Sequence, residues 1–179
     1  MGAATVPLCG SGEPLLYKDI RPLIDYITKL DMAVVIFTNG TCITPETAEF
    51  LITRNVEVFF KLWSFEPAVV DRMVGVKNAY EWADFSYTHN GTSRSVRIPC
   101  GLKFLLDSAE KHNRRGLVKT EVLITKINYT SVVEVVRFCE EMHLGLWLET
   151  ILLNGRAVEN YDDIALDSAQ YHALYYQLL

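Results

Sequence analysis

Cys9-Gly10-Ser11-Gly12-Glu13-Pro14-Leu15-Leu16 is the stretch that decides how the rest of the sequence is interpreted. It follows a short apolar segment, residues 5–8, that has the composition of a strand. The two glycines let the chain turn sharply and let a ligand approach the backbone. Pro14 favours an extended backbone at Glu13, which leaves main-chain carbonyl groups free. Such a turn suits a cation, for example an ammonium group, and the alternative is a plain strand-to-helix turn with a surface glutamate.

Apolar and amphipathic segments alternate along the whole chain, as expected for parallel strands joined by helices. The pattern predicts strands near residues 4–9, 33–38, 56–62, 118–125 and 144–150. It predicts helices near 19–30, 44–54, 66–73, 99–115, 130–142 and 167–179. We therefore expect an α/β fold, a partial TIM-type (β/α)6 barrel of parallel strands whose first strand is missing. A strand upstream of this sequence, or a partner, would cover the edge that this leaves.

Residues 77–95 interrupt this alternation, because they are rich in aromatic and small polar residues and show no period. Asn90-Gly91 is a typical turn of a β-hairpin and separates two short alternating runs. We predict that 77–95 is an insertion, either a flap that faces the substrate or a surface loop, in a single domain that spans residues 1–179.

Composition excludes several classes of protein. The chain has 179 residues, half of them hydrophobic, and a formal charge of −5, which gives no reason to expect nucleic-acid binding. It has no run of apolar residues long enough for a membrane span and no visible secretory signal, so a cytoplasmic location is expected. Its four cysteines (Cys9, Cys42, Cys100 and Cys139) are too far apart in the sequence to form a local metal site, and no metal ligand is predicted.

Polar residues stand where the predicted strands end. Thr38 and Asn39 follow the second strand, Lys61 and Ser64 follow the third, and Glu149 closes the last. The carboxyl ends of parallel barrel strands meet at one mouth, where active sites lie. Each residue also has a simpler interpretation: a turn at Asn39, a helix cap at Ser64, and charges that point to solvent at the other two.

In order and spacing, these motifs resemble those of radical S-adenosylmethionine (SAM) enzymes. Ser11-Gly12-Glu13-Pro14 is similar to the Gly-Gly-Glu-Pro motif of that family, which holds the amino group of SAM. The resemblance continues through residues 36–41, 58–64, 71–75, 125–128 and 147–149, and thus spans residues 4 to about 157. It implies that Ser11, Gly12, Glu13 and Pro14 contact the methionine part of SAM and that Ser64 contacts the ribose. Thr38 and Asn39, at the same mouth, would help to shape the SAM site. Because buried charges are costly unless paired, Lys61 and Glu149 would pair or meet a polar ligand if they line the barrel, which makes them the candidates for the substrate cavity.

The resemblance also implies a [4Fe-4S] cluster, at which SAM is cleaved to a 5′-deoxyadenosyl radical that takes hydrogen from a substrate. The family holds this cluster with a Cys-x-x-x-Cys-x-x-Cys loop, which is absent from this sequence. We therefore expect an internal fragment of a longer enzyme that is inactive by itself. In the full-length enzyme, an electron donor such as flavodoxin or ferredoxin and an unknown small-molecule or peptide substrate are implied, and the catalytic residues stay unknown. The alternatives are another β/α-barrel enzyme and a non-catalytic α/β binding scaffold.

Overall fold

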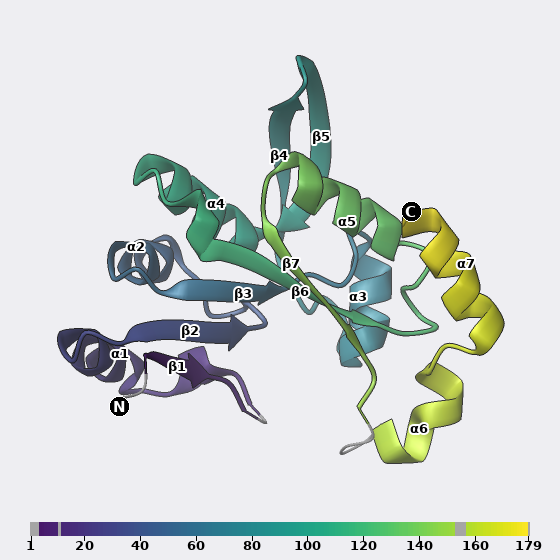
Figure 1. The fold of residues 1–179 in the computed structure, drawn as a ribbon, viewed down its shortest axis with the longest axis horizontal. Coiled ribbons are helices and arrows are strands. Elements are labelled where there is room, and N and C mark those ends of the chain that lie inside the picture. Colours follow the sequence, from purple (N-terminus) through teal and green to yellow (C-terminus); the bar gives the residue numbers. More distant parts are fainter. Residues whose placement is uncertain (1–3, 11, 153–156, 179) are drawn as a thin grey trace.

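Five parallel strands form the central sheet of the protein, which we analysed as a computed structural model that describes residues 4–10, 12–152 and 157–178. The strands are β1 (Thr5–Leu8), β2 (Ala33–Thr38), β3 (Glu57–Lys61), β6 (Val118–Ile124) and β7 (Gly145–Thr150). They lie in the order β1-β2-β3-β6-β7, so each new strand is added at the same side of the sheet (Figure 1). All the described pairs in this sheet are parallel, and their carboxyl ends therefore meet at one edge.

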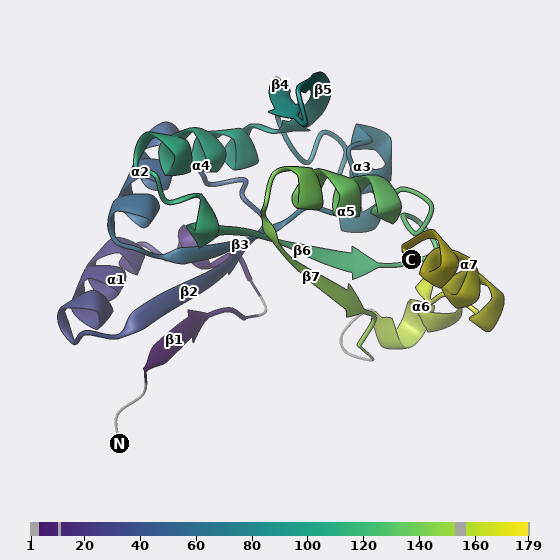
Figure 2. The same ribbon diagram turned by 45° about the horizontal axis from the view of Figure 1, so that its top comes forward.

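Helices cover one face of the sheet. α1 (Ile20–Lys29), α2 (Pro45–Thr53), α4 (Cys100–Lys111) and α5 (Val132–Glu141) lie on the same side of it (Figure 2). The strand residues that face these helices are apolar and almost fully buried, such as Ile36, Phe60 and Val122. This alternation of buried and less buried positions is what fixes which face of each strand receives the helices.

The remaining helices lie near the carboxyl edge and the end of the chain. α3 (Pro67–Val74) follows β3, and α6 (Ala157–Ile164) and α7 (Ser168–Leu178) follow β7. Short 3-10 turns are formed by η1 (Pro14–Leu16) and η2 (Arg115–Leu117). α6 was not predicted, because its sequence is short and rich in acidic residues. No helix in the described ranges is long and apolar enough to cross a membrane.

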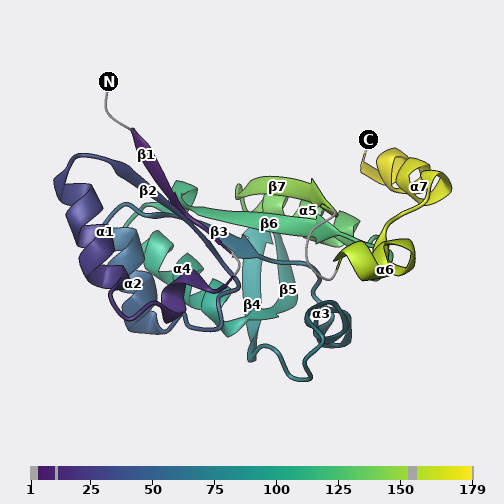
Figure 3. The ribbon, with the colours of Figure 1, turned by 90° about the horizontal axis from the view of Figure 1, so that it is seen from below.

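The irregular segment forms the antiparallel hairpin of β4 (Trp82–His89) and β5 (Thr92–Pro99). Asn90 and Gly91 both have positive φ at its turn, as the sequence signal requires. In Figure 3 the hairpin lies on the same side of the sheet as α1, α2 and α4. Phe85 and Tyr87 contact Phe138 of α5, which fastens the hairpin to the helical layer. That this segment is an insertion stays a prediction.

The second face of the sheet carries no helix in the described part of the chain (Figure 2). The five strands do not close into a barrel. The predicted fold class, an α/β partial barrel of parallel strands, is confirmed, and the uncovered face corresponds to the inside of such a barrel.

Candidate functional site

Glu13 joins the end of β1 to the end of β2. Its Oε1 accepts hydrogen bonds from the Thr38 hydroxyl (2.7 Å) and from the Leu15 N–H (3.1 Å). Its Oε2 accepts from the Asn39 N–H at 2.7 Å. Hydrogen bonds to a carboxylate are among the stronger ones in proteins. The carboxylate thus fastens the glycine-rich turn to β2, and it also caps η1 by accepting from the Leu15 N–H.

Thr38 and Asn39 support this turn. Thr38 is 1% exposed, and its hydroxyl accepts from the Gly40 N–H (2.9 Å) while it donates to Glu13. The Asn39 side chain accepts from the N–H and the hydroxyl of Thr41, which forms a local turn. The structure therefore brings both predicted residues to Glu13, where they position its carboxylate.

The backbone beside Glu13 is open. A Cβ atom added at Gly10 or at Gly12 would have no neighbour within 4 Å, so a ligand can approach the main chain there. Both glycines border a cavity of about 270 Å³ that also includes Glu13 and Pro14. Ser11, the other predicted residue of this turn, lies outside the described residues.

Ser64 lies in a buried polar network at the ends of β3 and β6. It is 0% exposed, and its hydroxyl accepts from the Glu66 N–H (3.1 Å) and from the Ser131 hydroxyl (3.2 Å). Asn128, also 0% exposed, donates to the carbonyl groups of Trp63 and Leu123 at 2.9 Å each. The hydroxyl of Ser64 thus stabilises the turn before α3. It is not the helix cap of the simpler interpretation, because the N-cap of α3 is Glu66 and no side chain caps it. Its assignment to the ribose stays a prediction.

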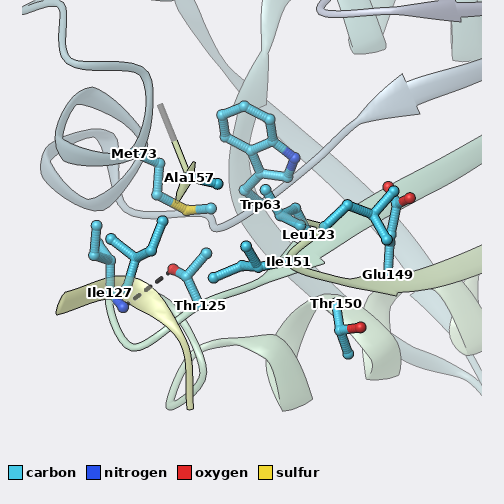
Figure 4. A pocket seen from close by; sticks show the side chains of 11 residues that line it. Trp63, Met73, Leu123, Thr125, Ile127, Glu149, Thr150, Ile151 and Ala157 are labelled. Atoms are coloured by element: carbon cyan, nitrogen blue, oxygen red, sulfur yellow. Dashed lines mark hydrogen bonds between the residues drawn. The ribbon is translucent and has the colours of Figure 1, made fainter. Parts of the chain in front are cut away.

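An apolar pocket of about 330 Å³ lies at the carboxyl ends of β6 and β7 (Figure 4). Met73 and Ile127 lie on one side of it and Glu149 on the other, with Trp63 between them. The indole N–H of Trp63 is buried and has no hydrogen-bond partner among the described residues. A buried donor without a partner costs about 1–3 kcal/mol, which a ligand with a suitable acceptor would recover.

Lys61 and Glu149 lie on the uncovered face of the sheet, together with a third charged residue, Glu121. That Lys61 and Glu149 line a substrate cavity stays a prediction. In the strand register Glu121 is paired with Lys61 on one side and with Trp147 on the other. Burial raises the pKa of the Glu121 carboxyl, the charge of Lys61 opposes this, and Glu149 adds to it through its charge and a hydrogen bond. Glu121 is 8% exposed.

The sequence interpretation missed Glu121 and Trp63. Glu121 interrupts the apolar alternation of residues 118–124, and such a charge within a strand buried on its other face is the signal that was available. Nothing in the sequence indicated that the Trp63 N–H would lack an acceptor, because this depends on residues from several elements.

The four cysteines do not form a metal site. Cys139 is buried in α5, and its thiol contacts the Thr120 hydroxyl at 3.1 Å, while Cys9 is exposed at the end of β1. Burial raises the pKa of Cys139 to about 11, which disfavours the thiolate that an iron ligand requires. Across the described ranges, no three His, Cys, Asp or Glu side chains are placed to hold a metal ion. These residues therefore do not fit an iron-sulfur cluster.

The SAM part of the predicted site fits better. The open backbone at Gly12 and the unpartnered Trp63 N–H lie at the same edge of the sheet, because both follow carboxyl ends of parallel strands. The fold and this edge are those of a partial α/β barrel of parallel strands.

Comparisons with known proteins support this class. No family model matches the chain. A curated relative, the AdoMet-dependent heme synthase of Nitratidesulfovibrio vulgaris, is 24% identical over 161 residues, which are 89% of this chain and 38% of the relative. The chain thus spans well under half the length of this relative. The predicted resemblance to radical SAM enzymes is confirmed by this relative and by the solved structures that share the fold.

Three solved structures illustrate the shared fold. Streptococcus suis SuiB bound to S-adenosylmethionine has a TM-score of 0.66 and 20% identity, over 96% of this chain and 35% of SuiB. anSMEcpe with bound AdoMet and the Cp18Cys peptide has a TM-score of 0.65 and 16% identity, over 99% and 46%. A domain of pyruvate-formate lyase-activating enzyme from Bacteroides vulgatus has a TM-score of 0.58 and 17% identity, over 99% of this chain and 93% of that domain.

Proposed function

We propose that this chain is the SAM-binding core of a radical SAM enzyme. In the full-length protein, SAM would be cleaved reductively at a [4Fe-4S] cluster held by residues outside this chain, and the resulting 5′-deoxyadenosyl radical would take hydrogen from a substrate. The observation that carries the proposal is the carboxyl edge of the sheet. There, an open glycine turn held by Glu13 and an apolar pocket with an unpartnered indole N–H lie in the fold of structures that bind SAM.

The glycine turn would receive the methionine end of SAM. The Glu13 carboxylate already accepts three hydrogen bonds, so its proposed role is to hold the turn and to make it electronegative. Backbone carbonyl groups of the open turn would then accept from the ammonium group, in accord with the absence of side-chain obstruction at Gly10 and Gly12.

The apolar pocket would receive the adenine. A flat ring system suits a cavity lined by Leu123, Ile127 and Met73. The ring nitrogens of adenine would accept the hydrogen bond for which the Trp63 N–H has no acceptor in the described residues. Thr38, Asn39 and Ser64 would act on SAM through the segments that they hold in place, and Ser64 is assigned to the ribose on the resemblance.

The substrate and electron donor also belong to the proposal. SuiB has been solved with the precursor peptide SuiA and anSMEcpe with the peptides Cp18Cys and Kp18Cys, which makes a peptide a reasonable substrate class here. A small-molecule substrate and a flavodoxin or ferredoxin as the electron donor stay predictions.

Two glycine variants test the SAM site. Gly12 and Gly116 both have open space where a Cβ would stand and need no left-handed backbone, so valine at either position leaves the fold intact. Gly116 lies in η2, before β6, at the opposite edge of the sheet. We expect Gly12→Val to weaken SAM binding by about tenfold or more in titration calorimetry and Gly116→Val to leave it unchanged.

The activity is tested on the full-length protein after anaerobic iron-sulfur reconstitution. The reconstituted protein should show an absorbance band at about 400 nm, as expected for such clusters. It should also release 5′-deoxyadenosine from SAM under reducing conditions. A full-length protein that stays colourless and does not bind SAM contradicts the proposal and favours another β/α-barrel enzyme or a binding scaffold.

A further inference from the structure

The uncovered face of the sheet carries three aromatic residues, here called the aromatic floor (Phe37, Phe59 and Trp147), next to a charged cluster (Lys61, Glu121 and Glu149). Phe37 and Phe59 stack with ring centroids 4.7 Å apart, and Trp147 meets both rings edge-on at 6.3 and 6.0 Å. Trp147 is 52% exposed, so a large part of its ring is open to a ligand. Aromatic faces attract organic cations. The floor already contacts one cation of the protein itself, because the Lys119 ammonium lies 5.4 Å from the Phe59 ring centroid.

The charged cluster adjoins this floor through Glu121, which is paired in register with Trp147. Glu121, which is 8% exposed, lies opposite Lys61 in the strand register, and Glu149 lies opposite Leu123, two residues farther along β6 on the same face. Farther along the same face, Lys119 is paired with Glu57 at 2.6 Å, so that pair is internally balanced. The cluster therefore has two carboxyl groups for one lysine.

This imbalance determines what the cluster can bind. Burial and the neighbouring Glu149 raise the pKa of the Glu121 carboxyl, so a proton on Glu121 can replace the missing positive charge. A ligand cation can take the place of that proton. A ligand anion would meet two carboxyl groups and would have to compete with them for Lys61.

We propose that the Glu121–Glu149 pair, together with the floor of Phe37, Phe59 and Trp147, binds an alkylammonium or guanidinium group of the substrate. This inference adds a substrate group to the proposed function. It rests on that function in one respect, which is that the substrate approaches SAM from the uncovered face. Glu149 also borders the apolar pocket, so the bound cation would stand beside the proposed adenine site. A peptide with a lysine or arginine side chain has the required group.

The experiment uses three probes that differ only in the end of their side chain. They are the Nα-acetyl amides of lysine, of norleucine and of glutamate, titrated calorimetrically into the SAM-saturated full-length protein. The lysine probe should bind, and the neutral norleucine probe should bind at least about tenfold more weakly. The glutamate probe should not displace the bound lysine probe. Comparison of buffers with different ionisation enthalpies should show release of up to about one proton on binding. Because the cation binds the ionised form of Glu121, the affinity should rise with pH until Glu121 is ionised in the free protein.

Four variants locate the site. Glu149→Gln should weaken lysine-probe binding by about tenfold, whereas Asp84→Asn, which removes an exposed carboxylate from the hairpin, should change it by less than about twofold. Glu121→Gln should abolish the proton release. Lys61→Met should strengthen binding of the lysine probe, because it removes a competing positive charge. Urea unfolding of each variant shows whether it is folded.

Several outcomes overturn the proposal. They are equal binding of the lysine and norleucine probes, no saturable binding of the lysine probe, loss of binding in Lys61→Met, or displacement of SAM by the probe. SAM affinity is measured separately in the same samples. Intact SAM binding without cation binding therefore refutes this inference and leaves the proposed function standing, whereas loss of SAM binding in the wild-type protein refutes the proposed function itself.

Discussion

Replacement of Gly40 by alanine should destabilise the protein far more than the same replacement at Gly75. The two glycines have nearly the same backbone, with φ of 78° and 75°. Their surroundings differ. A Cβ at Gly75 would meet nothing within 4 Å, whereas a Cβ at Gly40 would stand 2.0 Å from Cε2 of Phe60. The comparison thus separates the cost of the left-handed backbone from the cost of the contact.

The magnitude follows from this contact. The left-handed backbone costs alanine about 1–2 kcal/mol at either position. Carbon atoms pack at about 3.5 Å, so the Phe60 ring would have to move by roughly 1.5 Å. Phe60 is 0% exposed, and Gly101 packs so closely that a Cβ there would be 2.4 Å from the Gly40 carbonyl oxygen. Overpacking of this kind costs a further 1–3 kcal/mol or so. We therefore expect a loss of about 2–5 kcal/mol for Gly40→Ala and about 1–2 kcal/mol for Gly75→Ala.

Urea unfolding followed by circular dichroism measures both losses. Phe60→Leu removes part of the ring, so the double variant with Gly40→Ala should be more stable than the sum of the single losses predicts. Gly40→Ala should also weaken SAM binding, because Gly40 follows the Asn39 N–H that holds Glu13. Equal losses at Gly40 and Gly75, or strict additivity with Phe60→Leu, would refute the reasoning.

Three further predictions concern the site and the helical layer. Glu13→Ala should reduce the free energy of unfolding by about 2 kcal/mol in urea titrations, since three hydrogen bonds to a half-buried carboxylate are lost; an unchanged midpoint would contradict this. Asn128→Ala should cost about 3–5 kcal/mol in the same assay, because it leaves four buried partners unpaired, whereas Gln177→Ala on exposed α7 should cost less than about 0.5 kcal/mol. Hydrogen bonds from Lys111, and then from His112 and Ser108, hold the pKa of Glu49 at about 2, below its ordinary value of 4.5. Stability from this group is therefore present above pH 4.5 and lost as the pH falls towards 2, and Glu49→Gln should flatten the acid limb of a pH–stability profile in that window.

Much of the fold could be predicted because strands and crossover helices leave strong local signals. Residues 33–38, predicted as a strand, are β2 as observed, and the Asn90-Gly91 turn closes the hairpin at the expected place. α6 was not predicted, because its eight residues are rich in acidic side chains. Helix ends were predicted a few residues too long, as at 99–115 where α4 ends at Lys111, since basic residues continue past the last turn.

The candidate site could be predicted only in part. Sequence spacing placed Thr38 and Asn39 beside Glu13, because all three follow the ends of neighbouring parallel strands. It did not predict that Glu121 would join Lys61 and Glu149, since this depends on the register in which β6 pairs with β3 and β7. The register between strands that are distant in the sequence cannot be derived from local periodicity.

The polar residues at the carboxyl edge mostly bind the protein itself. The hydroxyls of Thr38 and Ser64 and the carboxylate of Glu13 are all engaged by backbone N–H or hydroxyl groups of the chain. What stays open for a ligand is of another kind: the backbone at Gly12 and the exposed ring of Trp147. The indole N–H of Trp63 is buried and has no acceptor among the described residues. A residue type that is typical of ligand contacts therefore indicates where the site lies, but not which atoms bind. If this division is correct, Ser64→Ala should lower stability at unchanged SAM affinity per folded molecule, whereas Gly12→Val should lower SAM affinity at unchanged stability.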